Sequence, residues 1–325
     1  MLAIIIHAFI ITTIAAVWKQ KSPDAPLKAW IIPGLLLKLF AGLTVGWLFL
    51  RYYGYGGDSW NMYQNARRIS TLAHQDLGAY LRFLLFNKYH YFAHLPDASI
   101  WEQPRYLFVV KVVSLINLAT QQNYWFTSFY FSLFAFSGLW QVANTLSRLF
   151  PATKLAAAFA FLVFPSVLFW SSGLQKESLA LGIMAWLIHW FLTIFCSSGR
   201  SGSWLRVVKI VFFSLVGLYG LWKLKFYYFG GLIPVLITVA LAYWVYTQLK
   251  TRQNQRPAFW LPLLLFIGIL SILLLAASFA HPNCICRSLC MYWCLITMQA
   301  SIFLILTMLF IITELVGGLP LLLLI

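Results

Sequence analysis

The chain has 325 residues, of which 62% are hydrophobic and only 9% are charged. Soluble globular domains carry about 25% charged residues, so this composition excludes an ordinary soluble protein and predicts a single integral membrane domain over residues 1–325. The net charge of +16 comes from Lys and Arg placed singly or in small groups between apolar runs. This distribution is typical of membrane proteins and not of a nucleic-acid-binding stripe, so we expect membrane lipids and no nucleic acid as partners.

Apolar runs that could cross the roughly 30 Å hydrocarbon core of a bilayer follow one another at 1–18, 30–50, 124–147, 155–171, 177–196, 207–222, 226–247, 258–280 and 295–320. They predict an all-α fold, a polytopic transmembrane helical bundle of about nine spans within a range of about eight to ten. A signal peptide carries its positive charge before the apolar region. Here Lys19 and Lys21 follow the first run, so we expect a retained helix.

Basic loops indicate the orientation of the bundle, because cytoplasmic loops are enriched in Lys and Arg. Four segments are expected in the cytoplasm for this reason: 19–29, 148–154, 197–209 and 248–257. Residues 106–120 are apolar but short, with Lys111 near the middle, and a span there would move the later basic loops to the wrong side. As an amphipathic interfacial helix, 106–120 leaves all four basic loops on one side. We therefore expect 51–122 to be a large extracytoplasmic loop that carries interfacial helices.

Near the start of this loop, Gly54, Gly56 and Gly57 precede Asp58, the first acid after the second apolar run. Apolar residues then recur at helical spacing, at Trp60, Tyr63, Ala66 and Ile69, so Asp58 is predicted to open an interfacial helix. Two roles fit Asp58: an N-cap of that helix, or a general base that takes a proton from a hydroxyl acceptor. The two roles are compatible, and the residue pattern leaves both open.

A pair of histidines in the same loop, His90 and His94, is spaced for one helix face. A zinc site needs more ligands, and no third ligand has convincing spacing. We therefore predict no metal site, while a requirement for a soluble divalent metal stays open.

Two later turns carry polar residues on the expected outer face. Gln175, Lys176 and Glu177 follow a Ser-Ser-Gly turn and open a helix, whose exposed N-terminal amides favour an anion. Lys223 and Lys225 stand in the next outer turn, against the usual charge bias, and a phosphate-bearing lipid would explain them. Two alternatives apply to these residues. Glu177 would stabilise the helix dipole, and the lysines would extend to the membrane interface beside aromatic side chains.

The C-terminal segment 284–325 differs from the rest of the chain. It is apolar and Cys-rich, with Cys284, Cys286, Cys290 and Cys294 close together. The spacing lacks the paired C-x-x-C of a metal site, while a disulfide is compatible with a position outside the cytoplasm. A third explanation is a shift of the reading frame near residue 283, which would make this tail atypical.

The segments GDSWNMY at 57–63 and FPSVLFWSSGLQKES at 164–178 resemble the GT-C superfamily of polytopic membrane glycosyltransferases. The resemblance covers roughly residues 30–283, although two helices precede the aspartate loop here and many members have one. It implies transfer of a sugar from a polyprenyl-phosphate donor to an acceptor glycan, lipid or protein, at the outer face of a bacterial cytoplasmic membrane. It assigns the catalytic base to Asp58, and binding of the donor phosphate or substrate to Lys176, Glu177, Gln175, Lys223, Lys225 and Tyr63.

Other functions share the same layout. A polytopic transporter or lipid flippase, a sugar-chain polymerase and an inactive scaffold of other membrane proteins are the alternatives. The sequence contains no Rossmann fingerprint and no P-loop, so a nucleotide-sugar donor is not expected.

Overall fold

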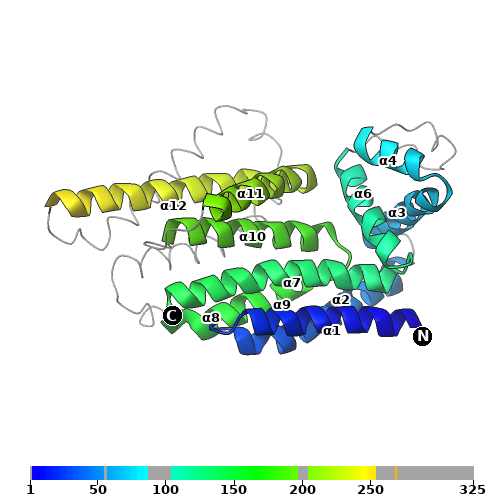
Figure 1. The fold of residues 1–325 in the computed structure, drawn as a ribbon, viewed down its shortest axis with the longest axis horizontal. Helices are drawn as coiled ribbons and strands as arrows, with labels where there is room; N and C mark the ends of the chain where they lie inside the picture. Colours follow the sequence, from blue (N-terminus) through cyan, green and yellow to red (C-terminus); the bar gives the residue numbers. More distant parts are fainter. Residues whose placement is uncertain (1, 55–56, 87–103, 197–203, 254–267, 269–325) are drawn as a thin grey trace. The chain divides into compact units, whose positions relative to one another are not determined.

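The computed structural model describes residues 2–54, 57–86, 104–196, 204–253 and 268, and Figure 1 shows their arrangement. All the regular elements of these residues are helices, which confirms the all-α prediction for the described part. The chain divides into two compact units at Lys225. In the second unit the long element is α12 (Phe226–Gln253), and the first unit holds the predicted site residues.

Four helices of the described residues are long and apolar enough to cross a membrane: α1 (Leu2–Lys21), α2 with the short turn before it (Lys28–Tyr53), α10 over Lys176–Ile194 and α11 (Trp204–Leu224). The length and composition of these helices indicate a helical membrane protein. The total of about nine spans and the side that each loop faces stay predictions. The run predicted at 295–320 and the tail 284–325 lie outside the described residues, as does the run at 258–280 apart from Gly268.

Helix α7 (Tyr124–Leu149) lies at the centre of the first unit, where it packs against α2 (Ile31–Tyr53) on one side and α10 (Lys176–Cys196) on the other (Figure 1). Its inward side chains include fully buried Phe131, Phe136 and Trp140. The contact with α10 is close because a Cβ on Gly138 would stand 2.5 Å from the carbonyl oxygen of Gly182. Small residues at such crossings let membrane helices approach each other.

The segment predicted to span at 155–171 is interrupted. It consists of α8 (Lys154–Ala158), a π-helical turn (Phe159–Val163) and α9 (Pro165–Trp170). Pro165 has no N–H to donate within the helix, and the backbone N–H of Phe164 bonds to the carbonyl of Phe159, five residues back, at 2.8 Å. After α9 the chain turns through Gly173, whose φ of +74° suits glycine, before α10 begins.

The predicted outer loop forms three helices that pack on one another, α3 (Asp58–Gln75), α4 (Leu77–Phe86) and α6 (Pro104–Ala119). They lie at one end of the long helices and not among them (Figure 1). The apolar spacing predicted for α3 is confirmed, because Trp60, Tyr63, Ala66 and Ile69 are all buried. Asn123 then caps the N-terminus of α7, because its Oδ1 accepts hydrogen bonds from the backbone N–H groups of Trp125 and Phe126.

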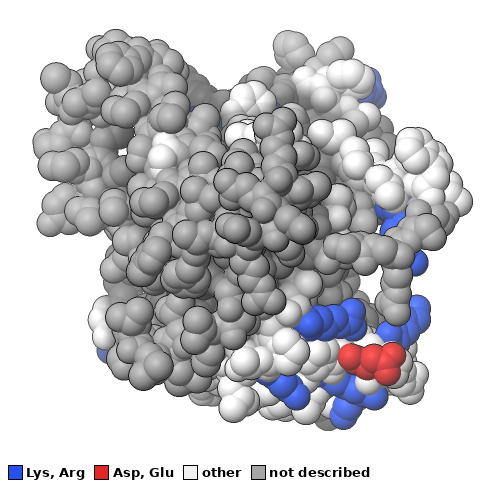
Figure 2. Space-filling model, turned by 90° about the vertical axis from the view of Figure 1, so that its left-hand side faces the viewer, with Lys and Arg blue, Asp and Glu red and all other residues white. Residues whose placement is uncertain are grey.

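The opposite end of the first unit is basic. There α1 ends and α7 leads into α8, and these segments carry one acid, Asp24, and the basic residues Lys19, Lys21, Lys28, Arg148 and Lys154. Contacts between the connection after α1 and the last turns of α7 bring these segments together, through a hydrogen bond of 3.0 Å from Trp140 Nε1 to the Leu27 carbonyl. Figure 2 looks onto this end, with its Lys and Arg side chains in blue.

Candidate functional site

The start of α3 is held against the turn before α10 by one buried serine. Ser59 Oγ donates a hydrogen bond of 2.7 Å to the carbonyl of Leu174 and accepts one of 2.7 Å from the hydroxyl of Tyr124. The Trp60 ring stacks on the Tyr124 ring, with centroids 3.9 Å apart. These contacts join α3, α7 and the 171–175 turn, so residues more than 100 positions apart meet at one end of the long helices.

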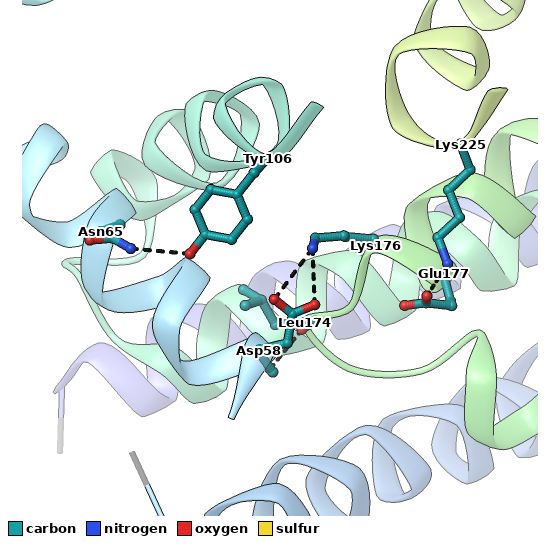
Figure 3. Close-up of polar contacts among 8 residues, drawn as sticks. Asp58, Asn65, Tyr106, Leu174, Lys176, Glu177 and Lys225 are labelled. Carbon is teal, nitrogen blue, oxygen red and sulfur yellow. Dashed lines mark hydrogen bonds and ion pairs between the residues drawn. The ribbon is translucent and has the colours of Figure 1, made fainter. Parts of the chain in front are cut away.

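Asp58 is the first residue of α3, and it faces the first residue of α10 (Figure 3). Lys176 Nζ lies 2.9 Å from one carboxylate oxygen of Asp58 and 3.3 Å from the other. The Asp58 side chain is 61% exposed and the Lys176 side chain 23%. Gly57 is the N-cap of α3 and Asp58 makes no capping hydrogen bond, so the N-cap role considered for Asp58 is wrong and its carboxylate pairs with lysine instead.

Helix α6 adds an aromatic ring to this pair. Lys176 Nζ lies 5.0 Å from the centroid of the Tyr106 ring, within the range of a cation–π interaction. The Tyr106 hydroxyl accepts a hydrogen bond of 3.1 Å from Asn65 Nδ2 on α3. Figure 3 shows Asp58 and Tyr106 beside the lysine, with Asn65 on the far side of the tyrosine. The ammonium group is thus positioned between a carboxylate and the face of an aromatic ring.

A second ion pair lies beside the first, because Glu177 follows Lys176 on α10. Glu177 Oε1 accepts a hydrogen bond from Lys225 Nζ, which comes from the residue after α11 (Figure 3). Both side chains are more enclosed than Asp58, with 25% of Glu177 and 13% of Lys225 exposed. Lys223 does not join this pair: its Nζ lies over the rings of Trp222 and Tyr219, at 5.1 and 5.7 Å from their centroids.

The other two predicted site residues are enclosed. Gln175 is 4% exposed, and its amide nitrogen has no hydrogen-bond partner within the described residues. Tyr63 is buried, and its hydroxyl donates to the carbonyl of Gln122 in the connection between α6 and α7. Burial raises the pKa of Tyr63, although the charge of nearby Arg67 opposes the shift, so its hydroxyl is a neutral donor that ties α3 to this connection.

Four of the predicted residues are therefore close together: Asp58, Lys176, Glu177 and Lys225. They form two acid–lysine pairs that meet at the N-terminus of α10. This arrangement provides one exposed carboxylate that can accept a proton and two ammonium groups that can bind an anion. Among the described residues no cluster of His, Cys, Asp and Glu could hold a metal ion. His90, His94 and the cysteines of the tail lie outside the described residues.

Sequence reasoning missed Ser59, Asn65 and Tyr106. A signal for Asn65 was present, because Asp58 and Asn65 are seven residues apart and so lie on the same face of a helix. The roles of Ser59 and Tyr106 depend on contacts with α7 and α10 that no local pattern contains.

Comparisons with models of protein families, with curated proteins and with solved structures find no match.

Proposed function

We propose that the protein is a membrane glycosyltransferase that moves a sugar from a polyprenyl-phosphate donor to an acceptor at the outer face of a bacterial cytoplasmic membrane. The observation that supports this best is the contact of 2.9 Å between exposed Asp58 and Lys176, beside the pair of Glu177 and Lys225. A carboxylate for proton transfer and lysines for a phosphate are the two groups that this reaction needs, and they lie within reach of one another.

In the proposed reaction an acceptor hydroxyl loses its proton to the Asp58 carboxylate while its oxygen attacks the anomeric carbon of the sugar. The bond from that carbon to the donor phosphate oxygen breaks, and its electron pair stays on the phosphate. Lys176 turns from Asp58 to this phosphate, which frees the base and stabilises the growing negative charge. Lys225 adds a second positive charge on the same side. Asp58 then returns its proton to solvent.

The remaining predicted residues have supporting roles in this proposal. Gln175 and Glu177 hold the turn and the second lysine beside the donor phosphate, and Tyr63 keeps α3 in place. Lys223, over two exposed aromatic rings, approaches lipid headgroups near the donor. Apolar side chains between the helices accommodate the polyprenyl chain.

The test is transfer by the purified full chain in lipid vesicles, supplied with polyprenyl-phosphate sugars and mixed acceptors. We expect release of lipid phosphate together with glycosylated acceptor. Asp58→Asn keeps the size of the side chain but removes the base, so the rate falls by about 10²–10⁴. The same assay with and without a chelator shows whether a divalent metal takes part.

Asp24→Asn is the matched control, because Asp24 is an exposed acid at the opposite, basic end of the long helices. This variant should transfer sugar at the parent rate. Equal transfer by Asp58→Asn and the parent would refute the assignment of the base.

A transporter or lipid flippase is the second candidate, and Lys38 favours it. This lysine is buried in α2 and donates a hydrogen bond to Ser171, at the end of the interrupted segment that α8 and α9 form. Transporters place ionisable side chains and interrupted helices together near the middle of the membrane. Movement of a labelled lipid across the vesicle membrane without release of lipid phosphate would favour this function. The same result would exclude both sugar transfer and a sugar-chain polymerase as the activity measured.

A further inference from the structure

Lys38 is a basic residue enclosed within the helices of the first unit. It lies in α2, one of the four helices long and apolar enough to cross a membrane, and is 2% exposed. Its Nζ donates to Ser171 Oγ, directly after the last residue of α9. An ionisable side chain inside a membrane helix is costly and indicates a functional role unless it is compensated.

Small residues pack the turn after α9 against α2 and α7 near this lysine. The backbone N–H of Gly173 donates a hydrogen bond of 2.8 Å to Ser132 Oγ on α7. A Cβ on Gly173 would stand 3.3 Å from the carbonyl oxygen of Gly42, one helical turn after Lys38, and 3.5 Å from Ser128 Oγ. Lys38 and Ser128 therefore approach the same turn from two neighbouring helices.

Hydrogen-bond donors are in excess around this turn. Lys38 carries three N–H groups, and its hydrogen bond within the described residues goes to Ser171. Ser128 Oγ and Gln175 Nε2 are buried without a hydrogen-bond partner among the described residues. Ser128 is fully buried and Gln175 is 4% exposed. Buried polar groups in folded proteins are normally paired, so three groups with free donor capacity along one turn indicate an absent acceptor.

An ammonium group on Lys38 also has no carboxylate partner within the described residues. Their carboxylates are engaged or lie elsewhere: Asp58 with Lys176, Glu177 with Lys225, Asp76 at the start of α4 and Asp24 at the basic end. The C-terminal end of a helix supplies at most about half a negative charge. Helix α9 has only six residues, and the Ser171 hydroxyl already occupies its Val167 carbonyl. A protonated Lys38 therefore has no full negative charge beside it among the described residues.

We propose that Lys38, the Ser128 hydroxyl and the Gln175 amide bind a small inorganic anion of the size of chloride at the turn after α9. A full negative charge would pair with the ammonium group and accept the free hydrogen bonds, which are strongest when one partner is charged. Because these side chains are at least nine-tenths buried, they suit a small ion better than the phosphate of a lipid, whose headgroup stays at the membrane surface. The anion site shares Gln175 and the turn before α10 with the proposed sugar-transfer site, but binding of the ion does not require sugar transfer.

The test measures the melting temperature of the purified full chain in detergent at constant ionic strength, while gluconate is replaced by chloride. A ligand that binds only the folded protein raises its melting temperature in a saturable way. We expect a rise of about 3–5 °C when chloride reaches about 100 times its dissociation constant. An unchanged melting temperature of the parent protein over the titration would overturn the proposal.

Lys38→Met removes the charge and should abolish the chloride response. Lys111→Met is the matched control, since Lys111 is a partly buried lysine of α6 that bonds to the Leu84 carbonyl, and it should keep the full response. If Lys38→Met does not fold, Ser128→Ala decides: loss of one hydrogen bond to the ion should raise the apparent chloride dissociation constant about tenfold. An unchanged constant in Ser128→Ala, or an unchanged response in Lys38→Met, would refute the site.

Discussion

The two ion pairs at the start of α10 differ in exposure, and we expect them to differ in their contribution to stability. Asp58→Asn and Glu177→Gln each remove one carboxylate charge with little change in size. Asp58 is 61% exposed, whereas Glu177 is 25% exposed and its partner Lys225 only 13%. Solvent therefore screens the first pair much more than the second.

The expected magnitudes follow from this difference. At 2.9 Å the Coulomb energy of the Asp58 pair is about 1.4 kcal/mol in the dielectric of water, and ordering of two side chains offsets much of it. Exposed ion pairs accordingly contribute about 0.2–1 kcal/mol. Loss of the Glu177 carboxylate takes a partner from an enclosed ammonium group and should cost about 2 kcal/mol. The corresponding falls in melting temperature are at most about 2 °C for Asp58→Asn and about 3 °C for Glu177→Gln.

The assay follows thermal unfolding of both variants and of the parent in one detergent, together with the rate of sugar transfer in vesicles. Asp58→Asn should lose transfer and keep its stability, because its carboxylate acts on the acceptor and contributes little to the fold. Glu177→Gln should show the larger fall in melting temperature, because its carboxylate pairs with an enclosed ammonium group.

A fall in melting temperature for Asp58→Asn as large as that for Glu177→Gln would refute this reasoning. The Asp58 pair would then be a structural link between α3 and α10, and loss of transfer could not be assigned to base chemistry.

Further predictions concern helix packing, capping and orientation. Gly138→Ala should destabilise the protein by about 1–3 kcal/mol despite the better helix propensity of alanine, because its Cβ would stand 2.5 Å from a carbonyl oxygen of α10; Gly220→Ala, which meets one side-chain atom at 3.5 Å, should be neutral or stabilising in the same melting experiment. Asn123→Ala should cost about 1 kcal/mol, measured by chemical unfolding, because α7 loses the cap that two amides share; a loss close to zero would contradict the capping role. Asp24→Cys, in a chain without its own cysteines, should react with an impermeant maleimide only after the membrane is opened, and Asp58→Cys should react in intact cells; the reverse pattern would invert the proposed orientation.

Local patterns predicted much of the fold. The apolar runs at 30–50, 177–196 and 207–222 correspond to α2, α10 and α11 within a few residues, because length and hydropathy are properties of a continuous segment. The helical spacing after Asp58 predicted which face of α3 is buried. The interruption of 155–171 was harder to predict, since Pro165 is visible in the sequence but its effect depends on whether the surrounding helices accommodate the freed backbone groups.

The candidate site was predictable only in part. Asp58, Lys176, Glu177 and Lys225 were selected because polar side chains in an apolar chain need a reason, and this argument requires no knowledge of contacts. Which acid meets which lysine was beyond the sequence, since the partners are 118 and 48 positions apart. Gln175 was selected on the same grounds and Tyr63 through the resemblance of the segment 57–63, and both are buried.

The sequence by itself therefore determined that this is an all-α membrane protein and that its few polar side chains between the apolar runs need an explanation, because composition and periodicity are local quantities. Only the tertiary structure decided how these side chains are used. Packing of α2, α7 and α10 encloses Lys38 and Gln175, while the end of the long helices leaves Asp58 in contact with water. Burial and pairing arise from contacts between distant segments, and these contacts separate an exposed carboxylate suited to proton transfer from an enclosed lysine suited to an anion.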